Sequence, residues 1–271
     1  MTNPVLSIRN LSIDYVGAKS EFHAVKNVSF DIGRGEFFGL AGESGCGKST
    51  IAFAIPRLHR PPAIIRTGSQ ILLDGRDVLA LDEAALRELR WREVAMVFQS
   101  AMNSLNPVLT IERQFYDVLK THTGMGRPAA RARAAELLKL VDISADRLSA
   151  YPHQLSGGMR QRVVIAICLA LNPKLLIMDE PTTALDVVVQ REILERIHKL
   201  RQELGFSVLF ITHDLALMVQ VSDRIGIMLE GELVEVNDAQ AIYRAPQHDY
   251  TRKLWASIPR LSGERTVQGV Q

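Results

Sequence analysis

The stretch Gly42-Glu43-Ser44-Gly45-Cys46-Gly47-Lys48-Ser49, followed by Thr50, is the strongest structural signal in the sequence. It fits the pattern G-x-x-x-x-G-K-[ST], whose glycines let the backbone curl so that several N–H groups point at one phosphate. An apolar run at residues 36–41 precedes it, and a helix-compatible run at residues 51–55 follows it. A strand, a glycine-rich turn and a helix in this order are the context that a phosphate-binding loop requires.

Specific side chains of this loop have predicted roles, and we expect every residue from Gly42 to Thr50 to line a nucleotide site. Lys48 can reach the β- and γ-phosphates, and the Ser49 hydroxyl can bind Mg²⁺. Inward N–H groups favour a thiolate at Cys46, so we expect it to react with maleimides, whereas Cys168, in an apolar helical run, should be inert. A glycine-rich turn with a chance lysine is the alternative, which the strand and helix context disfavours.

Composition and charge narrow the class of protein. The chain has 271 residues, of which 47% are hydrophobic and 23% charged, with a net charge of +2. This is a globular composition for one large domain or two modest ones, and it predicts neither a nucleic-acid partner nor a polybasic membrane anchor. The first residues lack a signal-peptide pattern and the longest apolar run, residues 163–171, is too short to span a bilayer, so we expect a cytoplasmic chain. Its two cysteines predict no disulfide framework.

The pattern of elements predicts an α/β fold. Residues 5–32 alternate apolar and polar side chains, which indicates an antiparallel sheet ahead of the phosphate loop. Buried strands are expected at residues 94–98, 175–178 and 207–212, with a hairpin at 225–235. Between the first two, helices at 111–120 and 129–141 indicate a helical insert. We therefore expect one domain at residues 1–236, with a helical subdomain at about 100–158, and a short C-terminal extension at 237–271.

Two adjacent carboxylates follow a buried strand, at Asp179 and Glu180. Ligands of parallel α/β sheets collect at the carboxyl ends of strands, so both side chains should lie beside the phosphate loop. Asp179 offers the hard oxygen that Mg²⁺ prefers, and Glu180 can polarise the attacking water. A solvated turn is the alternative, but paired carboxylates at such an edge favour chemistry.

Three single residues are weaker candidates. Gln99 and His213 each end a strand of the expected sheet and could contact the γ-phosphate, but a lone glutamine or histidine in such a place is more often structural. Tyr15 could stack on an adenine ring or be a half-buried strand aromatic, and its spacing does not decide between them. A second glycine-rich helix start, Ser156-Gly157-Gly158, could bind another anion or be an ordinary capped helix.

In this order the motifs resemble those of the ATPase subunits of ATP-binding-cassette (ABC) transporters, over about residues 5–259. The resemblance implies a P-loop NTPase cassette with a RecA-like core. It also implies that Tyr15 stacks on adenine, that Gln99 contacts Mg²⁺ as well as the γ-phosphate side, and that Asp186 contacts nucleotide. The stretches that carry the likeness are the phosphate loop, Gln99, Leu155-Ser156-Gly157-Gly158-Met159, residues 175–180, Ala184-Leu185-Asp186 and His213.

The resemblance also implies partners. Two such subunits, paralogous or identical, should close face to face, with ATP between the phosphate loop of one and residues 156–158 of the other. Residues 99–107, 157–163, 181–187 and 246–251 are similar to the peptide, opine and nickel importer branch, and Met159 resembles its D-type peptide ATPases, although Asp249 stands where proline is usual. This implies di- or oligopeptide uptake with membrane-spanning permease subunits and an extracytoplasmic solute-binding protein, at the cytoplasmic face of the membrane.

Other functions remain open at this point. The same branch could import nickel, an opine or another small solute. A non-transport ATPase of the same fold is the rival class. Members of that class in translation carry two cassettes in one chain, and those in repair carry a long coiled-coil insert; the sequence has neither. A module that binds ATP without turnover is disfavoured by Glu180 and His213.

Overall fold

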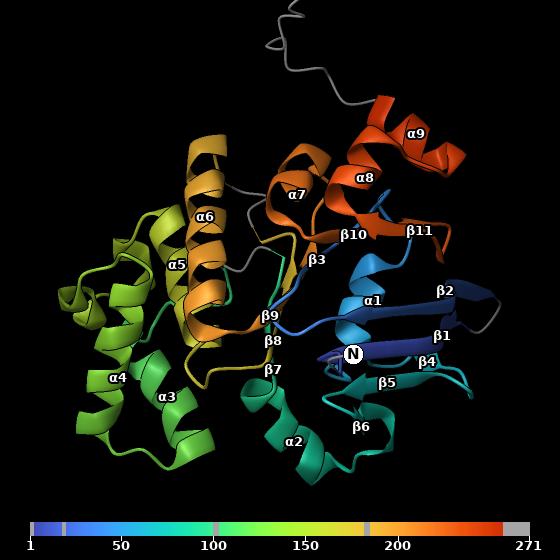
Figure 1. Cartoon of the computed structure of the whole chain (residues 1–271). Helices are drawn as coiled ribbons and strands as arrows, with labels where there is room; N and C mark the ends of the chain where they lie inside the picture. The colour runs from blue at the N-terminus through green and yellow to red at the C-terminus, as the bar shows by residue number, and fades with distance from the viewer. Residues whose placement is uncertain (1–2, 18–19, 100–102, 182–184, 257–271) are drawn as a thin grey trace, which may run out of the picture.

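The computed structural model describes residues 3–17, 20–99, 103–181 and 185–256. Two β-sheets organise them, with helices around both (Figure 1). The N-terminal sheet is antiparallel, as the alternating pattern predicts, and has the order β2-β1-β5-β6 with β4 also paired to β1. Its strands are β1 (Leu6–Val16), β2 (Glu21–Ile32), β4 (Ala63–Ile65), β5 (Gln70–Leu73) and β6 (Arg76–Asp77).

The central sheet has the order β11-β10-β3-β9-β8-β7, and only its β10–β11 pair is antiparallel. Every residue of β3, β8 and β9 is buried, which explains their unbroken apolar runs. The carboxyl ends of the parallel strands therefore share one edge, where a ligand site is expected. The strands are β3 (Phe37–Gly42), β7 (Val94–Val97), β8 (Leu175–Asp179), β9 (Ser207–Ile211), β10 (Arg224–Leu229) and β11 (Glu232–Asp238).

Two apolar cores cover opposite faces of the central sheet. Phe37 and Phe210 belong to the core shared with the helical insert, and Phe38 and Leu209 to the core shared with the N-terminal sheet. Successive strand residues point to opposite faces, so adjacent residues divide between the cores. The helices are α1 (Lys48–Ala54), α2 (Glu83–Arg92), α3 (Ile111–Thr123), α4 (Arg127–Leu140), α5 (Gly157–Cys168), α6 (Val187–Leu204), α7 (Leu215–Val221), α8 (Ala239–Arg244) and α9 (Asp249–Ala256).

The helical insert lies at one side of the central sheet and the N-terminal sheet at the other (Figure 1). Thr110 caps α3 by accepting a hydrogen bond from the N–H of Arg113, and Gly124 ends the helix in a left-handed conformation. The insert thus begins at the end of β7 and returns to the sheet through α5. Parts of the predicted motifs, residues 100–102, 182–184 and 257–271, lie outside the described residues.

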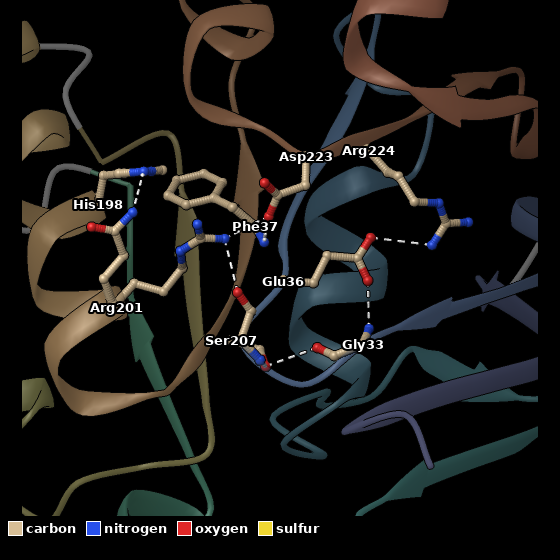
Figure 2. Close-up of polar contacts among 10 residues, drawn as sticks. Gly33, Glu36, Phe37, His198, Arg201, Ser207, Asp223 and Arg224 are labelled. Carbon is tan, nitrogen blue, oxygen red and sulfur yellow. Dashed lines mark hydrogen bonds and ion pairs between the residues drawn. The ribbon is translucent and has the colours of Figure 1, made fainter. Parts of the chain in front are cut away.

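Polar contacts fasten the amino end of β3 (Figure 2). The guanidinium of Arg201, on α6, donates to the carbonyl of Gly35 at 2.8 Å and pairs with Asp223, which also accepts from the N–H of Phe37 at 2.7 Å. The Ser207 hydroxyl accepts from the N–H of Gly35 at 2.8 Å. The strand that leads into the phosphate loop is therefore fixed where it begins.

The expected boundary at residue 236 falls inside a strand, because β11 continues to Asp238. The carboxylate of Glu235 accepts hydrogen bonds from the N–H groups of Gln247 at 2.9 Å and His248 at 3.0 Å. The described part of the C-terminal extension is thus bound to the central sheet, and its division from the domain stays a prediction.

Candidate active site

The phosphate loop runs from the end of β3 into α1, and its glycines are required by geometry. Gly42, Gly45 and Gly47 have φ angles of 149°, 80° and 104°, the region that other residues rarely adopt. A Cβ on Gly47 would lie 2.3 Å from the carbonyl oxygen of Ala24 on β2. The loop is therefore packed directly on the N-terminal sheet.

Lys48 is buried, with 6% of its surface exposed, and its ammonium donates to the loop carbonyls of Gly42 at 2.8 Å and Glu43 at 2.7 Å. Cys46 is equally buried, at 6%, and its sulfur lies where a side chain on Gly42 would meet it. This burial counts against the expected reaction of Cys46 with maleimides, which stays a prediction. Cys168 is buried too, and burial raises the pKa of its thiol to about 12, in agreement with an inert residue.

Ser49 joins the phosphate loop to the carboxyl end of β8. Its hydroxyl donates to the carboxylate of Asp179 at 3.0 Å, across 130 residues of sequence. Burial raises the pKa of Asp179 above its ordinary value, with a further rise from the negative charge of Glu180, while the hydrogen bond from Ser49 and the charge of Lys48 oppose it. An oxygen atom of Ser49 and one of Asp179 thus lie side by side at the phosphate loop. Oxygen atoms of this kind are the ligands that Mg²⁺ prefers.

The three predicted residues at strand ends meet one another. The amide of Gln99 donates to Glu180 at 2.9 Å, and the Nδ1 atom of His213 lies 3.6 Å from the other carboxylate oxygen. Glu180 has a φ of 45°, and its N–H donates to the carbonyl of Ile211 on β9 at 2.8 Å. Two side chains, from the ends of the strands on either side of β8, therefore converge on the carboxylate that follows β8.

Tyr15 lies beside the first turn of α1, with its hydroxyl 3.4 Å from the hydroxyl of Thr50. This places its hydroxyl beside the end of the phosphate loop, as adenine stacking requires, and a half-buried strand aromatic could occupy the same place. Stacking on adenine stays a prediction.

The remaining predicted residues form a second group. Ser156 caps α5 by accepting from the N–H of Met159 at 3.3 Å, and Asp186 caps α6 by accepting from Val188 and Val189 at 3.1 and 3.0 Å. A Cβ on Gly158 would lie 2.7 Å from the side chain of Val189, so the two helix starts adjoin. Helix α5 packs against α3, α4, α6 and β7, on the side of the sheet away from α1 (Figure 1).

A sequence profile described as ABC transporter matches residues 25–183, more than half of the chain. The chain belongs to the ABC transporter family. The cassette is 48% identical, over 96% of its length, to the peptidoglycan transport ATP-binding protein YejF of Agrobacterium fabrum, and it spans only 48% of that protein. It is 42% identical to the oligopeptide transport ATP-binding protein OppD and the dipeptide transport ATP-binding protein DppD of Bacillus subtilis, over 98% and 95% of this chain and 75% and 77% of theirs.

The ABC cassette also has a solved structural neighbour. The ATP-binding cassette MJ0796, in a dimeric post-hydrolysis state bound to ADP and Pi, superposes with a TM-score of 0.75 and 32% identity, over 86% of this chain and 98% of that one. The predicted fold, an ABC cassette of the P-loop NTPase class, is thereby confirmed. Within the ranges that the structure describes, no helix is both long and apolar enough to cross a membrane.

One contact at the loop of this cassette was not predicted from the sequence. The hydroxyl of Tyr250, on α9, accepts a hydrogen bond from the backbone N–H of Glu43 at 3.2 Å. The spacing of Tyr250 in the sequence does not indicate a partner 207 residues away. The sequence of the tail shows only a likeness to an importer branch.

Proposed function

We propose that this chain is the ATP-binding and ATP-hydrolysing subunit of an ABC importer, coupling hydrolysis to solute uptake. The contact between Ser49 and Asp179 carries the proposal, because it joins the loop that would hold the phosphates to the strand end that supplies the carboxylates. Family membership and the likeness to a nucleotide-bound cassette support the same function.

ATP would bind with its phosphates against the loop N–H groups and the ammonium of Lys48, and with adenine on Tyr15. The oxygens of Ser49 and Asp179, with Gln99 nearby on Glu180, fit a Mg²⁺ site. When bound, Mg²⁺ would neutralise charge on the β- and γ-phosphates, and it would also favour the ionised form of Asp179 against the burial that raises its pKa.

Glu180 would orient and polarise the attacking water by accepting its proton. The amide of Gln99, at 2.9 Å, fixes one carboxylate oxygen, and His213 lies within reach of the other. His213 would hold the γ-phosphate. Gln99 and His213 are therefore both in contact with Glu180 at the sheet edge, where a γ-phosphate could bind beside them.

The second group, Ser156 to Gly158 with Asp186, would serve a partner cassette. A dimeric structural neighbour supports a second ATPase subunit, identical or paralogous. Permease subunits would hold the pair at the cytoplasmic face of the membrane, with the helical insert as their dock, and a solute-binding protein would deliver the solute from outside.

Peptides are the solutes that the names of several relatives favour, including an oligopeptide and a dipeptide transport protein. Nickel, an opine or another small solute is the alternative within the same branch, and a non-transport ATPase is less favoured. The cassette, reconstituted with its permease subunits, should show ATPase activity that rises when a peptide-loaded binding protein is added. Stimulation by nickel alone would favour the nickel importer, and the absence of stimulation by any solute would favour the non-transport ATPase.

Removal of the Lys48 charge tests nucleotide binding directly. Lys48→Ala should weaken ATP binding at least about tenfold, since a hydrogen bond to a charged group contributes about 1.5–3 kcal/mol. Calorimetry with ATP measures this, and Lys139→Ala, at an exposed lysine of α4, is the matched control. Unchanged affinity in the Lys48 variant would refute the assigned site.

A further inference from the structure

The described tail of the chain reaches the phosphate loop. Tyr250 lies in the first turn of α9, and its hydroxyl accepts a hydrogen bond from the N–H of Glu43, the second residue of the loop, at 3.2 Å. This residue has no place in the mechanism above. It nevertheless touches the backbone that the mechanism depends on.

The backbone of Glu43 is held from both sides. Its N–H donates to Tyr250, while its carbonyl oxygen accepts from the ammonium of Lys48 at 2.7 Å. A continuous chain of hydrogen bonds therefore connects the tail hydroxyl, one residue of loop backbone and the lysine that would bind phosphate. Displacing Glu43 would change the surroundings of Lys48.

The position of Tyr250 is itself fixed by the central sheet. Glu235, on β11, accepts from the N–H groups of Gln247 and His248, and the Nδ1 atom of His248 accepts from the N–H of Tyr250 at 3.2 Å. The next residue, Thr251, is fully buried, and the Tyr250 ring packs against the core that the sheet shares with the helical insert. Burial, with the nearby charge of Glu43, raises the pKa of the Tyr250 phenol, so its hydroxyl stays protonated at neutral pH.

We propose that Tyr250 is a positioning residue for ATP: its hydroxyl holds the Glu43 end of the phosphate loop, and through it Lys48, in the arrangement that receives the phosphates. The inference rests on the proposed ATPase function. It assigns the tail a role inside the nucleotide site, in addition to any contact with other subunits.

Tyr250→Phe tests this, because it removes only the hydroxyl and keeps the packed ring. Losing the contacts of this hydroxyl with the backbone and the side chain of Glu43 should raise the Kd and the KM for ATP by about two- to tenfold, with kcat at saturating ATP within about twofold of the wild-type value. Tyr243→Phe is the matched control, since that ring is half exposed and stacks edge-on against Trp255, away from the loop. An unchanged or lower Kd in the Tyr250 variant would overturn the proposal.

The two cysteines give a second readout that needs no nucleotide. Cys46 is buried in the loop, whereas Cys168 lies in α5, where the burial that raises its pKa to about 12 makes it an internal control. Tyr250→Phe should speed maleimide labelling of Cys46 without nucleotide and leave Cys168 unlabelled; an unchanged Cys46 rate would overturn the proposal. A wild-type chain that binds no ATP would refute the proposed function, and the labelling rate would still decide whether the tail holds the loop.

A purely structural role for Tyr250 predicts a different pattern. If the hydroxyl only fastened the tail, Tyr250→Phe would lower the melting temperature and make α9 sensitive to protease, with kcat falling as well. The positioning role requires melting temperature and protease resistance close to those of the wild type. Detachment of α9 in the variant would therefore overturn the proposal even if ATP binding weakened.

Discussion

Glu180 shows how much the site depends on one residue. Its φ of 45° is a conformation that costs a non-glycine residue about 1–3 kcal/mol, and the hydrogen bond from its N–H to β9 helps to hold it there. This turn directs the carboxylate toward Gln99 and His213 instead of along the strand. The strain is thus located at the residue to which we assign the chemistry.

Glu180→Gln keeps the shape of the side chain and removes the charge that accepts a proton. We expect kcat to fall by about 10²–10⁴, the usual contribution of a general base, with the Kd for ATP unchanged. Steady-state hydrolysis and calorimetry separate the two effects, and Glu192→Gln, at an exposed position of α6, is the control. Hydrolysis at the wild-type rate in the Glu180 variant would remove the residue from the mechanism.

The sequence predicts most residues of the site because their chemistry is local. A strand that ends in Asp179 and Glu180 presents both at the sheet edge beside the phosphate loop, and the hydrogen bond from Ser49 to Asp179 agrees with that expectation. The burial of Cys46 could not be predicted, since it depends on how the loop folds over its sulfur. The contact of Tyr250 is likewise a tertiary one, without a local signal.

At the scale of elements, periodicity and capping residues predict the strands and helices well. Asp82 and Thr110 cap α2 and α3, since the side chain of each accepts a hydrogen bond from a backbone N–H of the first turn, as their residue types favour. The order of strands in the central sheet does not follow from such patterns. β3 pairs with β9 and β10, whose residues come more than 160 positions later, and only packing of the finished sheet selects those neighbours.

The attachment of α9 to β11 depends on the charge of Glu235. Burial alone would raise its pKa, but the hydrogen bonds that its carboxylate accepts hold the pKa below the ordinary value. Glu235→Gln should reduce the free energy of unfolding by about 1–3 kcal/mol at pH 7. Urea denaturation measures this loss, and Glu232→Gln, exposed on the same strand, is the control.

The pH dependence of this effect has a definite sign. A carboxyl whose pKa is lower in the folded state stabilises the fold above its unfolded pKa of about 4.3, and that contribution disappears as the pH falls through the folded value. The difference between wild type and Glu235→Gln should therefore be constant from pH 7 to about pH 5 and shrink below about pH 4. A difference that grows on acidification would contradict the role of the carboxylate.

For the whole molecule, the separation of its two groups of site residues is the main feature. One group surrounds Lys48, and the other caps α5 and α6, helices that lie on the side of the sheet away from α1 (Figure 1). If both groups bind ATP as proposed, a complete site would need two chains, each supplying one half of two sites.

Two nucleotides held between two cassettes should couple association to ATP. Glu180→Gln with ATP should shift the cassettes toward a closed dimer, because a ligand that the dimer binds more tightly than the separate cassettes stabilises the dimer by mass action. The distance between spin labels on the two cassettes of the assembled importer measures closure, since a paralogue could be the natural partner. A variant that binds ATP without turnover and never closes would contradict the two-chain site.

The fastening of β3 at its amino end has a mechanical consequence. Arg201 and Asp223 fix the strand at Gly35 and Phe37, and the phosphate loop begins at its other end, about 20 Å away for six extended residues. Sliding this strand along its neighbours would break these contacts as well as the ladders to β9 and β10. In the proposed ATPase, β3 would therefore act as a stiff base for the phosphate loop, and we expect movement to arise in other parts of the site.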